Sequence, residues 1–121
     1  MSKKTVNLHI SSLEDMGRRF VTAWKDAEAG RAVESEHNIT FLGLESFTAA
    51  LSPKRLEILR RLRAAGPSSV RALAALLERD YKSVHSDVGM LIGAGLVTRE
   101  ARDRVSVTWD RVVAEMDLAA A

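Results

Sequence analysis

Residues 52–109 constrain the fold most, because they hold three short amphipathic stretches followed by two runs in which polar and apolar residues alternate. Ser52 followed by Pro53 is typical of a helix start, since a serine side chain accepts a bond from free backbone N–H groups and proline suits the first turn. Gly66 ends that helix, and Ser69 is placed to cap the next one. This order predicts three helices and then a β-hairpin.

The third of these helices is expected to begin near Tyr81, after a turn at residues 78–80, and to end at Gly95. At 100° per residue, one inward face holds the apolar residues Tyr81, Val84, Val88, Leu91 and Ile92. The opposite face holds small and polar residues, namely Lys82, Ser86, Gly89 and Gly93, flanked by Ser83, His85 and Met90. Such a face suits close approach to base edges and phosphates. The alternative is that its glycines pack against a neighbouring helix or a second copy.

The hairpin is predicted from alternation in residues 96–101 and 104–109, with a connection through Arg102 and Asp103. Three arginines cluster around its tip, Arg99, Arg102 and Arg104, where they could contact phosphates or a minor groove. Exposed arginines are ordinary on any soluble protein, so this signal is weak alone. The apolar spacing of residues 110–118 predicts a short last helix that could return to the N-terminal segment.

The first 51 residues predict a strand–helix–strand appendage. Residues 5–10 and 38–42 alternate as strands do, residues 13–29 have helical spacing with Phe20 and Trp24 on one stripe, and residues 44–51 suit one or two helical turns. We expect an α+β fold, mainly α, with residues 1–51 as an appendage that serves dimerisation. Residues 52–121 are expected to form the second domain, a winged helix-turn-helix that binds DNA. In that domain the first helix is expected to bury Leu56, Leu59 and Leu62.

Charge is distributed unevenly along the chain. The formal net charge is only +2, but residues 53–104 carry 11 basic and 6 acidic side chains, a local excess of +5. Such a segment attracts phosphate and speeds encounter with it, although a solvated basic face would look the same. The chain has no cysteine, no apolar run of membrane-spanning length and no signal-peptide pattern. We therefore expect a cytoplasmic protein without a membrane partner.

Enzyme and metal chemistry find little support in the sequence. The three histidines, His9, His37 and His85, lie on separate elements without metal-ligand spacing, and there is no cysteine. Serine-nucleophile elbows, P-loops and dinucleotide glycine patterns do not occur. We therefore expect no enzyme, no cofactor and no metal. Asp80 is placed to cap the third helix, and Arg79 with Asp87 could form an ion pair that fixes the preceding turn.

Residues 52–59, residues 67–97 and the tryptophan that ends the hairpin, about half the chain in all, carry a resemblance to a known family. The stretch RDYKSVHSDV at residues 79–88 is its most specific part, and Pro67, Ser69, Val70, Arg71, Leu73 and Ala74 precede it. The chain resembles MarR-like winged helix-turn-helix proteins, and more closely a small DNA-binding, antitoxin-like subgroup. It departs from that subgroup at Glu78, where glycine is usual, and in a hairpin tip that lacks glycine.

The resemblance implies a dimeric, sequence-specific DNA-binding transcriptional regulator, expected to act as a repressor. Residues 81–94 would enter the major groove of double-stranded DNA and residues 99–104 would form the wing. The candidate DNA contacts are Ser69, Arg71, Arg79, Tyr81, Lys82, Ser83, His85, Ser86, Arg99, Arg102 and Arg104. The alternative is an antitoxin or protein-interaction module that neutralises a partner toxin and regulates its own gene by DNA binding.

Overall fold

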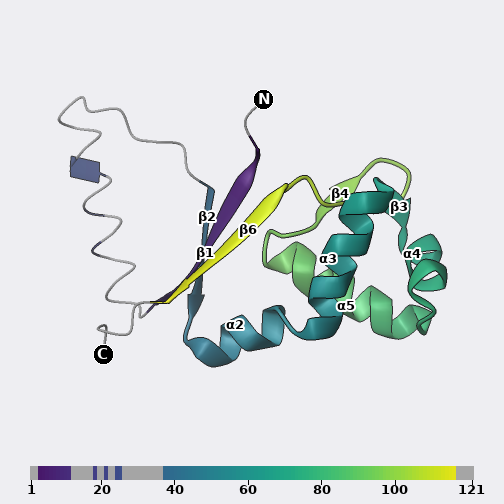
Figure 1. Cartoon of the computed structure of the whole chain (residues 1–121), viewed down its shortest axis with the longest axis horizontal. Helices are drawn as coiled ribbons and strands as arrows, with labels where there is room; N and C mark the ends of the chain where they lie inside the picture. Colours follow the sequence, from purple (N-terminus) through teal and green to yellow (C-terminus); the bar gives the residue numbers. More distant parts are fainter. Residues whose placement is uncertain (1–2, 12–17, 19–20, 22–23, 26–36, 117–121) are drawn as a thin grey trace. The chain divides into compact units, whose positions relative to one another are not determined.

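The computed structural model describes residues 3–11, 18, 21, 24–25 and 37–116. In chain order its elements are β1 (Thr5–Ser11), β2 (His37–Leu42), α2 (Leu44–Ala50), α3 (Pro53–Ala65), β3 (Ser68–Ser69), α4 (Val70–Leu77), α5 (Tyr81–Gly93), β4 (Thr98–Glu100), β5 (Arg104–Ser106) and β6 (Arg111–Met116) (Figure 1). The fold mixes helices with small sheets. The chain divides into two compact units. The first unit comprises Met1–Lys4 and Thr48–Arg111, and the second comprises Thr5–Phe47 and Val112–Ala121.

One sheet has the strand order β2-β1-β6. β1 pairs in parallel with β2, from Val6 opposite His37 to Ser11 opposite Leu42. Val6 and Leu8 of the central strand are fully buried, two positions apart and therefore on the same face. The alternation in residues 5–10 and 38–42 thus predicted both strands correctly.

The C-terminal segment differs from the sequence prediction. A helix was expected over residues 110–118, but Arg111–Met116 is the strand β6. The apolar residues Val112, Val113 and Met116 fit a helical stripe, yet two adjacent β-branched residues favour a strand. An isolated helix this short is marginal, whereas pairing with β1 gives the segment backbone hydrogen-bond partners in a three-stranded sheet. The segment does return to the N-terminal part of the chain, as a strand.

Most of the helix predicted at residues 13–29 lies outside the described residues. The four residues described there, Arg18, Val21, Trp24 and Lys25, are helical and exposed. The helical turns expected at residues 44–51 are present as α2.

Helices α3, α4 and α5 pack against one another around an apolar core. Its helical residues are Ile58, Leu59, Leu62, Leu73, Ala74, Val84, Val88 and Leu91. Two of the residues expected to face inward do not, since Leu56 and Tyr81 are each 41% exposed. The buried stripe of α3 follows Ile58 and Leu62 instead, which turns Leu56 outward. Tyr81 lies in the first turn of α5, where its ring contacts Arg71 rather than the core.

The second sheet has the order β3-β5-β4, and its hairpin joins β4 to β5. Its strands are shorter than the alternating sequence predicts: β4 begins at Thr98, after the buried Leu96 and Val97, and β5 ends at Ser106. Trp109 donates a 3.3 Å bond from its indole N–H to the carbonyl of Gly95. The hairpin is thereby attached at its base to the end of α5.

Glu78, between α4 and α5, provides a prediction about stability. Its backbone has φ 54° and ψ 45°, a left-handed conformation that glycine adopts without strain and other residues do not. Glu78→Gly should therefore raise the free energy of unfolding by about 0.5–1 kcal/mol, as measured by urea denaturation. Glu78→Ala keeps the strain and removes the charge, so an equal gain from that variant would contradict the conformational explanation.

Candidate nucleic-acid interface

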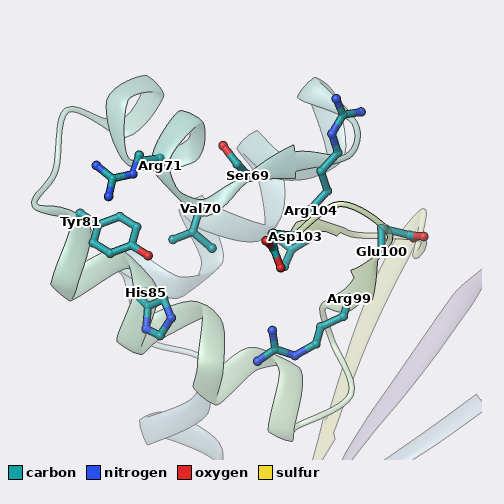
Figure 2. Close-up of a pocket in the computed structure, with 10 residues that line it drawn as sticks. Ser69, Val70, Arg71, Tyr81, His85, Arg99, Glu100, Asp103 and Arg104 are labelled. Carbon is teal, nitrogen blue, oxygen red and sulfur yellow. The ribbon is translucent and has the colours of Figure 1, made fainter.

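A pocket of about 420 Å³ lies among the start of α4, the first turns of α5 and the β4–β5 hairpin (Figure 2). Its lining residues are Ser69, Val70, Arg71, Tyr81, His85, Arg99, Glu100, Asp103, Arg104 and Val105. Six of these were candidate DNA contacts from the sequence, namely Ser69, Arg71, Tyr81, His85, Arg99 and Arg104. Side chains from three elements that are separate in the sequence therefore surround one space.

The helical side of this pocket is a stack of cationic and aromatic groups. The Arg71 guanidinium lies 5.0 Å from the centre of the Tyr81 ring, a cation–π distance. The Tyr81 and His85 rings follow one another on α5, with centres 5.7 Å apart. Ser69 supports this side, because its hydroxyl accepts a 3.0 Å bond from the Ala72 N–H and caps α4. Arg71 is thus held in place while it stays exposed.

The hairpin side of the pocket carries both signs of charge. Arg99 extends toward α5, whereas Arg104 points away from the middle of the pocket (Figure 2). Glu100 and Asp103 bring two carboxylates, of which Glu100 accepts a 2.6 Å bond from the Ser106 hydroxyl. The pocket therefore has three arginines against two carboxylates, and Asp103 lowers its positive potential.

Arg102 lies at the tip of the same hairpin. Three residues separate the paired Glu100 and Arg104, and two of them, Arg102 and Asp103, have positive φ values of 63° and 55°. The tip thus turns tightly without glycine, and the Arg102 side chain is exposed there. Arg102 does not line the pocket.

The outer face of α5 is open to solvent. Lys82, Ser83 and Ser86 are exposed, and a Cβ added to Gly89 or Gly93 would meet no heavy atom within 4 Å. The glycines therefore do not pack against a neighbouring helix within the part of the chain that the structure describes. Ser83 also takes part in the helix cap, since its N–H donates a 3.1 Å bond to the Asp80 carboxylate.

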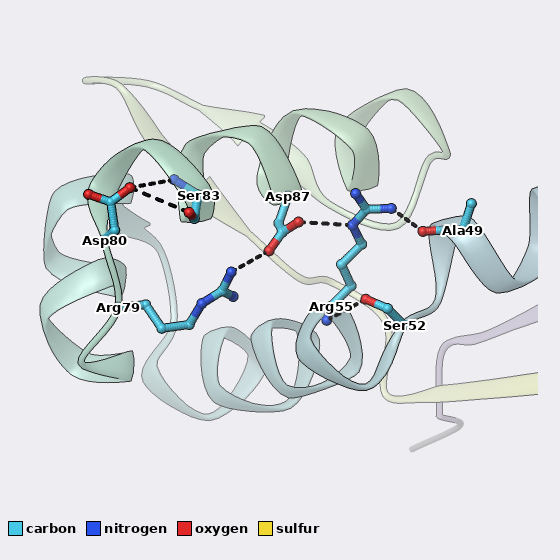
Figure 3. Close-up of polar contacts among 7 residues, drawn as sticks. All are labelled: Ala49, Ser52, Arg55, Arg79, Asp80, Ser83 and Asp87. Atoms are coloured by element: carbon cyan, nitrogen blue, oxygen red, sulfur yellow. Dashed lines mark hydrogen bonds and ion pairs between the residues drawn. The ribbon is translucent and has the colours of Figure 1, made fainter.

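An ion-pair cluster on the inner side of α5 fixes this helix to α3 and to the turn before it (Figure 3). Asp87 accepts a 2.7 Å bond from Arg79 and a 3.1 Å bond from Arg55. The side chains are only 15%, 21% and 17% exposed, respectively. Arg55 also donates to the Ala49 carbonyl, in the helix before α3. The ion pair expected between Arg79 and Asp87 is confirmed, and Arg55 extends it to three residues.

The cluster keeps Asp87 ionised. Burial alone would raise the pKa of the Asp87 carboxyl, but the hydrogen bonds from Arg79 and Arg55, with their positive charges, outweigh it and hold the pKa below its ordinary 3.8. Arg79 Nη1 is buried without a hydrogen-bond partner among the described residues. The geometry thus directs Arg79 inward, toward Asp87, and gives it a structural role.

The candidate residues therefore fall into three groups. Six line the pocket, four lie on the exposed face of α5 or at the hairpin tip (Lys82, Ser83, Ser86 and Arg102), and Arg79 belongs to the inner cluster. The sequence analysis missed Val70, Glu100, Asp103 and Val105 in the pocket, and Arg55 beside Asp87. Glu100 and Asp103 are visible in the sequence pattern, because each directly follows an arginine of the hairpin.

His9, on β1, contacts residues of the strands on both sides of it. His9 Nε2 lies 2.8 Å from the Asn38 side-chain oxygen, and His9 Nδ1 lies 3.7 Å from Glu115, so this ring joins all three strands of the β2-β1-β6 sheet. Within the described ranges, no group of three or more His, Cys, Asp or Glu residues could hold a metal ion. None of the helices described there has the length and apolar character needed to cross a membrane.

The fold and pocket define a small α and β protein with an arginine-rich space between a helix pair and a hairpin. The chain belongs to the HVO_A0114 family, whose model matches residues 50–114 and so includes every element of this pocket. No curated protein and no solved structure matches the chain.

Proposed function

We propose that this protein is a sequence-specific transcriptional regulator, a repressor that binds double-stranded DNA through a winged helix-turn-helix. In this proposal α4 and α5 are the helix-turn-helix and the β4–β5 hairpin is the wing. The observation that carries it is the gathering of Arg71, His85 and Arg99, from α4, α5 and the hairpin, around one pocket beside the open face of α5.

The outer face of α5 suits insertion into a major groove. That groove is about 12 Å wide and admits a helix whose first residues reach the base edges. Lys82 and Ser86 are exposed near the start of α5, where such contacts are made. Further along, Gly89 and Gly93 present no side chain, so the helix can lie close to the phosphate backbone or the groove wall.

The pocket suits one phosphate group of the DNA backbone. Arg71 and Arg99 supply positive charge from opposite sides, and His85 adds a ring N–H donor. Arg102, exposed at the hairpin tip, would contact the next phosphate or the minor groove. Arg79 would act indirectly in this proposal, because its bond to Asp87 fixes α5 to the turn that precedes it, while Arg55 ties Asp87 to α3.

The test is a fluorescence-anisotropy titration with a duplex taken from upstream of the protein's own gene, at two salt concentrations. We expect tighter binding to this duplex than to an unrelated duplex of equal length, and weaker binding at higher salt because phosphate contacts release counterions. Equal, salt-independent signals with both duplexes would reject the proposal.

Asp103→Asn should strengthen DNA binding. The substitution removes one of the two carboxylates that line the pocket, and asparagine tolerates the positive φ of 55° at this position. We expect the dissociation constant to fall by roughly 3-fold to 10-fold at low salt, as expected for one charge near a phosphate. Unchanged affinity at every salt concentration would place the DNA backbone away from this pocket.

A further inference from the structure

We propose that β6 is a homodimerisation edge, at which the β6 strands of two copies pair antiparallel. In the strand order β2-β1-β6, β6 lies at the end of the sheet, and none of the described strands pairs with its outer edge. Such an edge presents unpaired backbone N–H and C=O groups, which readily accept another strand.

The charges on β6 are self-complementary. Its sequence is RVVAEM, with Arg111 and Glu115 four positions apart and Val113 midway between them. A twofold axis at Val113 makes the two strands antiparallel and places Arg111 of each copy opposite Glu115 of the other. These three residues point to one face of the sheet, because side chains alternate along a strand. Each dimer then gains two ion pairs, one on each side of a Val113–Val113 contact.

The apolar side chains on the other face agree with the same register. There Val112 lies opposite Ala114 of the other copy, and Val112 and Met116 are 39% and 46% exposed in the single chain. Pairing would remove part of this apolar surface from water. Many exposed edges carry like charges, which repel a second copy, but the opposite charges of β6 attract one. The edge strand β2, HNITFL, contains no acidic or basic pair that could do the same.

The test uses three versions of the full chain in sedimentation-equilibrium runs over a range of concentrations. The wild type should form dimers as concentration rises. Arg111→Glu places Glu opposite Glu, and Glu115→Lys places Arg opposite Lys, so each variant alone should dissociate at least about tenfold more readily. An equimolar mixture of the two variants restores both opposite-charge pairs, and it should associate as the wild type does.

Recovery in the mixture is the decisive result, because a variant that merely unfolded could not be rescued by another chain. Circular dichroism confirms beforehand that both variants fold. A wild type that stays monomeric at every concentration overturns the proposal, and so do single variants that dimerise as well as the wild type. A mixture that remains monomeric overturns the register. Neither substitution changes a residue that is proposed to contact DNA, so the result of this test is independent of the proposed function.

Discussion

Asp87→Asn should lower the free energy of unfolding by about 3 kcal/mol, because it removes the carboxylate that pairs with both Arg55 and Arg79 in the described part of the chain. Asparagine has nearly the same shape, so the core around α5 stays filled and the loss reports the charge. Two guanidinium groups that are 17% and 21% exposed would then lie together without a counter-charge. Urea denaturation should show a lower midpoint with an unchanged dependence of the free energy on urea.

The pH dependence of this difference has a defined sign. The pKa of Asp87 is lowered in the folded protein, mainly because the two arginine bonds overcome the effect of burial. A carboxyl whose pKa is lowered on folding stabilises the fold at pH values above its pKa in the unfolded chain, about 3.9. This stabilisation is lost as the pH falls through the pKa of the folded state. The free energy of unfolding of the wild type should therefore exceed that of Asp87→Asn by a constant amount, about 3 kcal/mol, at pH 5–7. The two should converge below about pH 4.

Asp110→Asn is the matched control. Asp110 also accepts from an arginine, Arg63, and from the backbone N–H of Lys4, and these bonds lower the pKa of its carboxyl. This pair is open to solvent, where ion pairs contribute little to stability. Its loss should be much smaller than that of Asp87→Asn. Equal losses would show that the inner cluster has no special stabilising role.

Arg71→Gln combined with Arg99→Gln should weaken DNA binding by about 100-fold near physiological salt, because each arginine faces the proposed phosphate pocket. Losing two phosphate contacts should also reduce the slope of log affinity against log salt by about 1.8. Both side chains are exposed, so the melting temperature should barely change. Anisotropy titrations at several salt concentrations measure both effects.

The control for this variant is Lys54→Gln combined with Arg60→Gln. Both residues are exposed on α3 and neither lines the pocket, so the change in net charge is the same. If binding depends only on net charge, the two double variants will weaken it equally, and the assignment of the pocket fails. We expect the α3 variant to retain most of the affinity.

The helix boundaries were predictable because their signals are local. The caps Ser52, Ser69 and Asp80 each accept a bond from the backbone N–H three residues later, so a few neighbouring residues determine where α3, α4 and α5 begin. The strand β6 was not predictable in this way. Its apolar residues fit a helical period as well, and its pairing depends on β1 at the other end of the chain.

The residues of the site were also predictable only where they lie close together in the sequence. The arginines of the hairpin and the polar start of α5 could be read from their order in the sequence, and so could the pair Arg79 and Asp87, eight residues apart. Arg55 lies 32 residues before Asp87, and only the packing of α3 against α5 brings them together. The position of Asp103 in the pocket was likewise not predictable, because only the folded chain brings the hairpin tip beside the starts of α4 and α5.

The position of β6 has a consequence for how the protein folds during synthesis. Lys4, just before β1, is bonded to Asp110, just before β6, and the two are 106 residues apart. At ribosomal speeds, roughly 5–20 s therefore pass between the synthesis of β1 and the synthesis of β6, while the helices between them are already able to fold. We expect nascent chains to expose a bare strand edge during that interval, which makes the β2-β1-β6 sheet the part of the protein most dependent on chaperones.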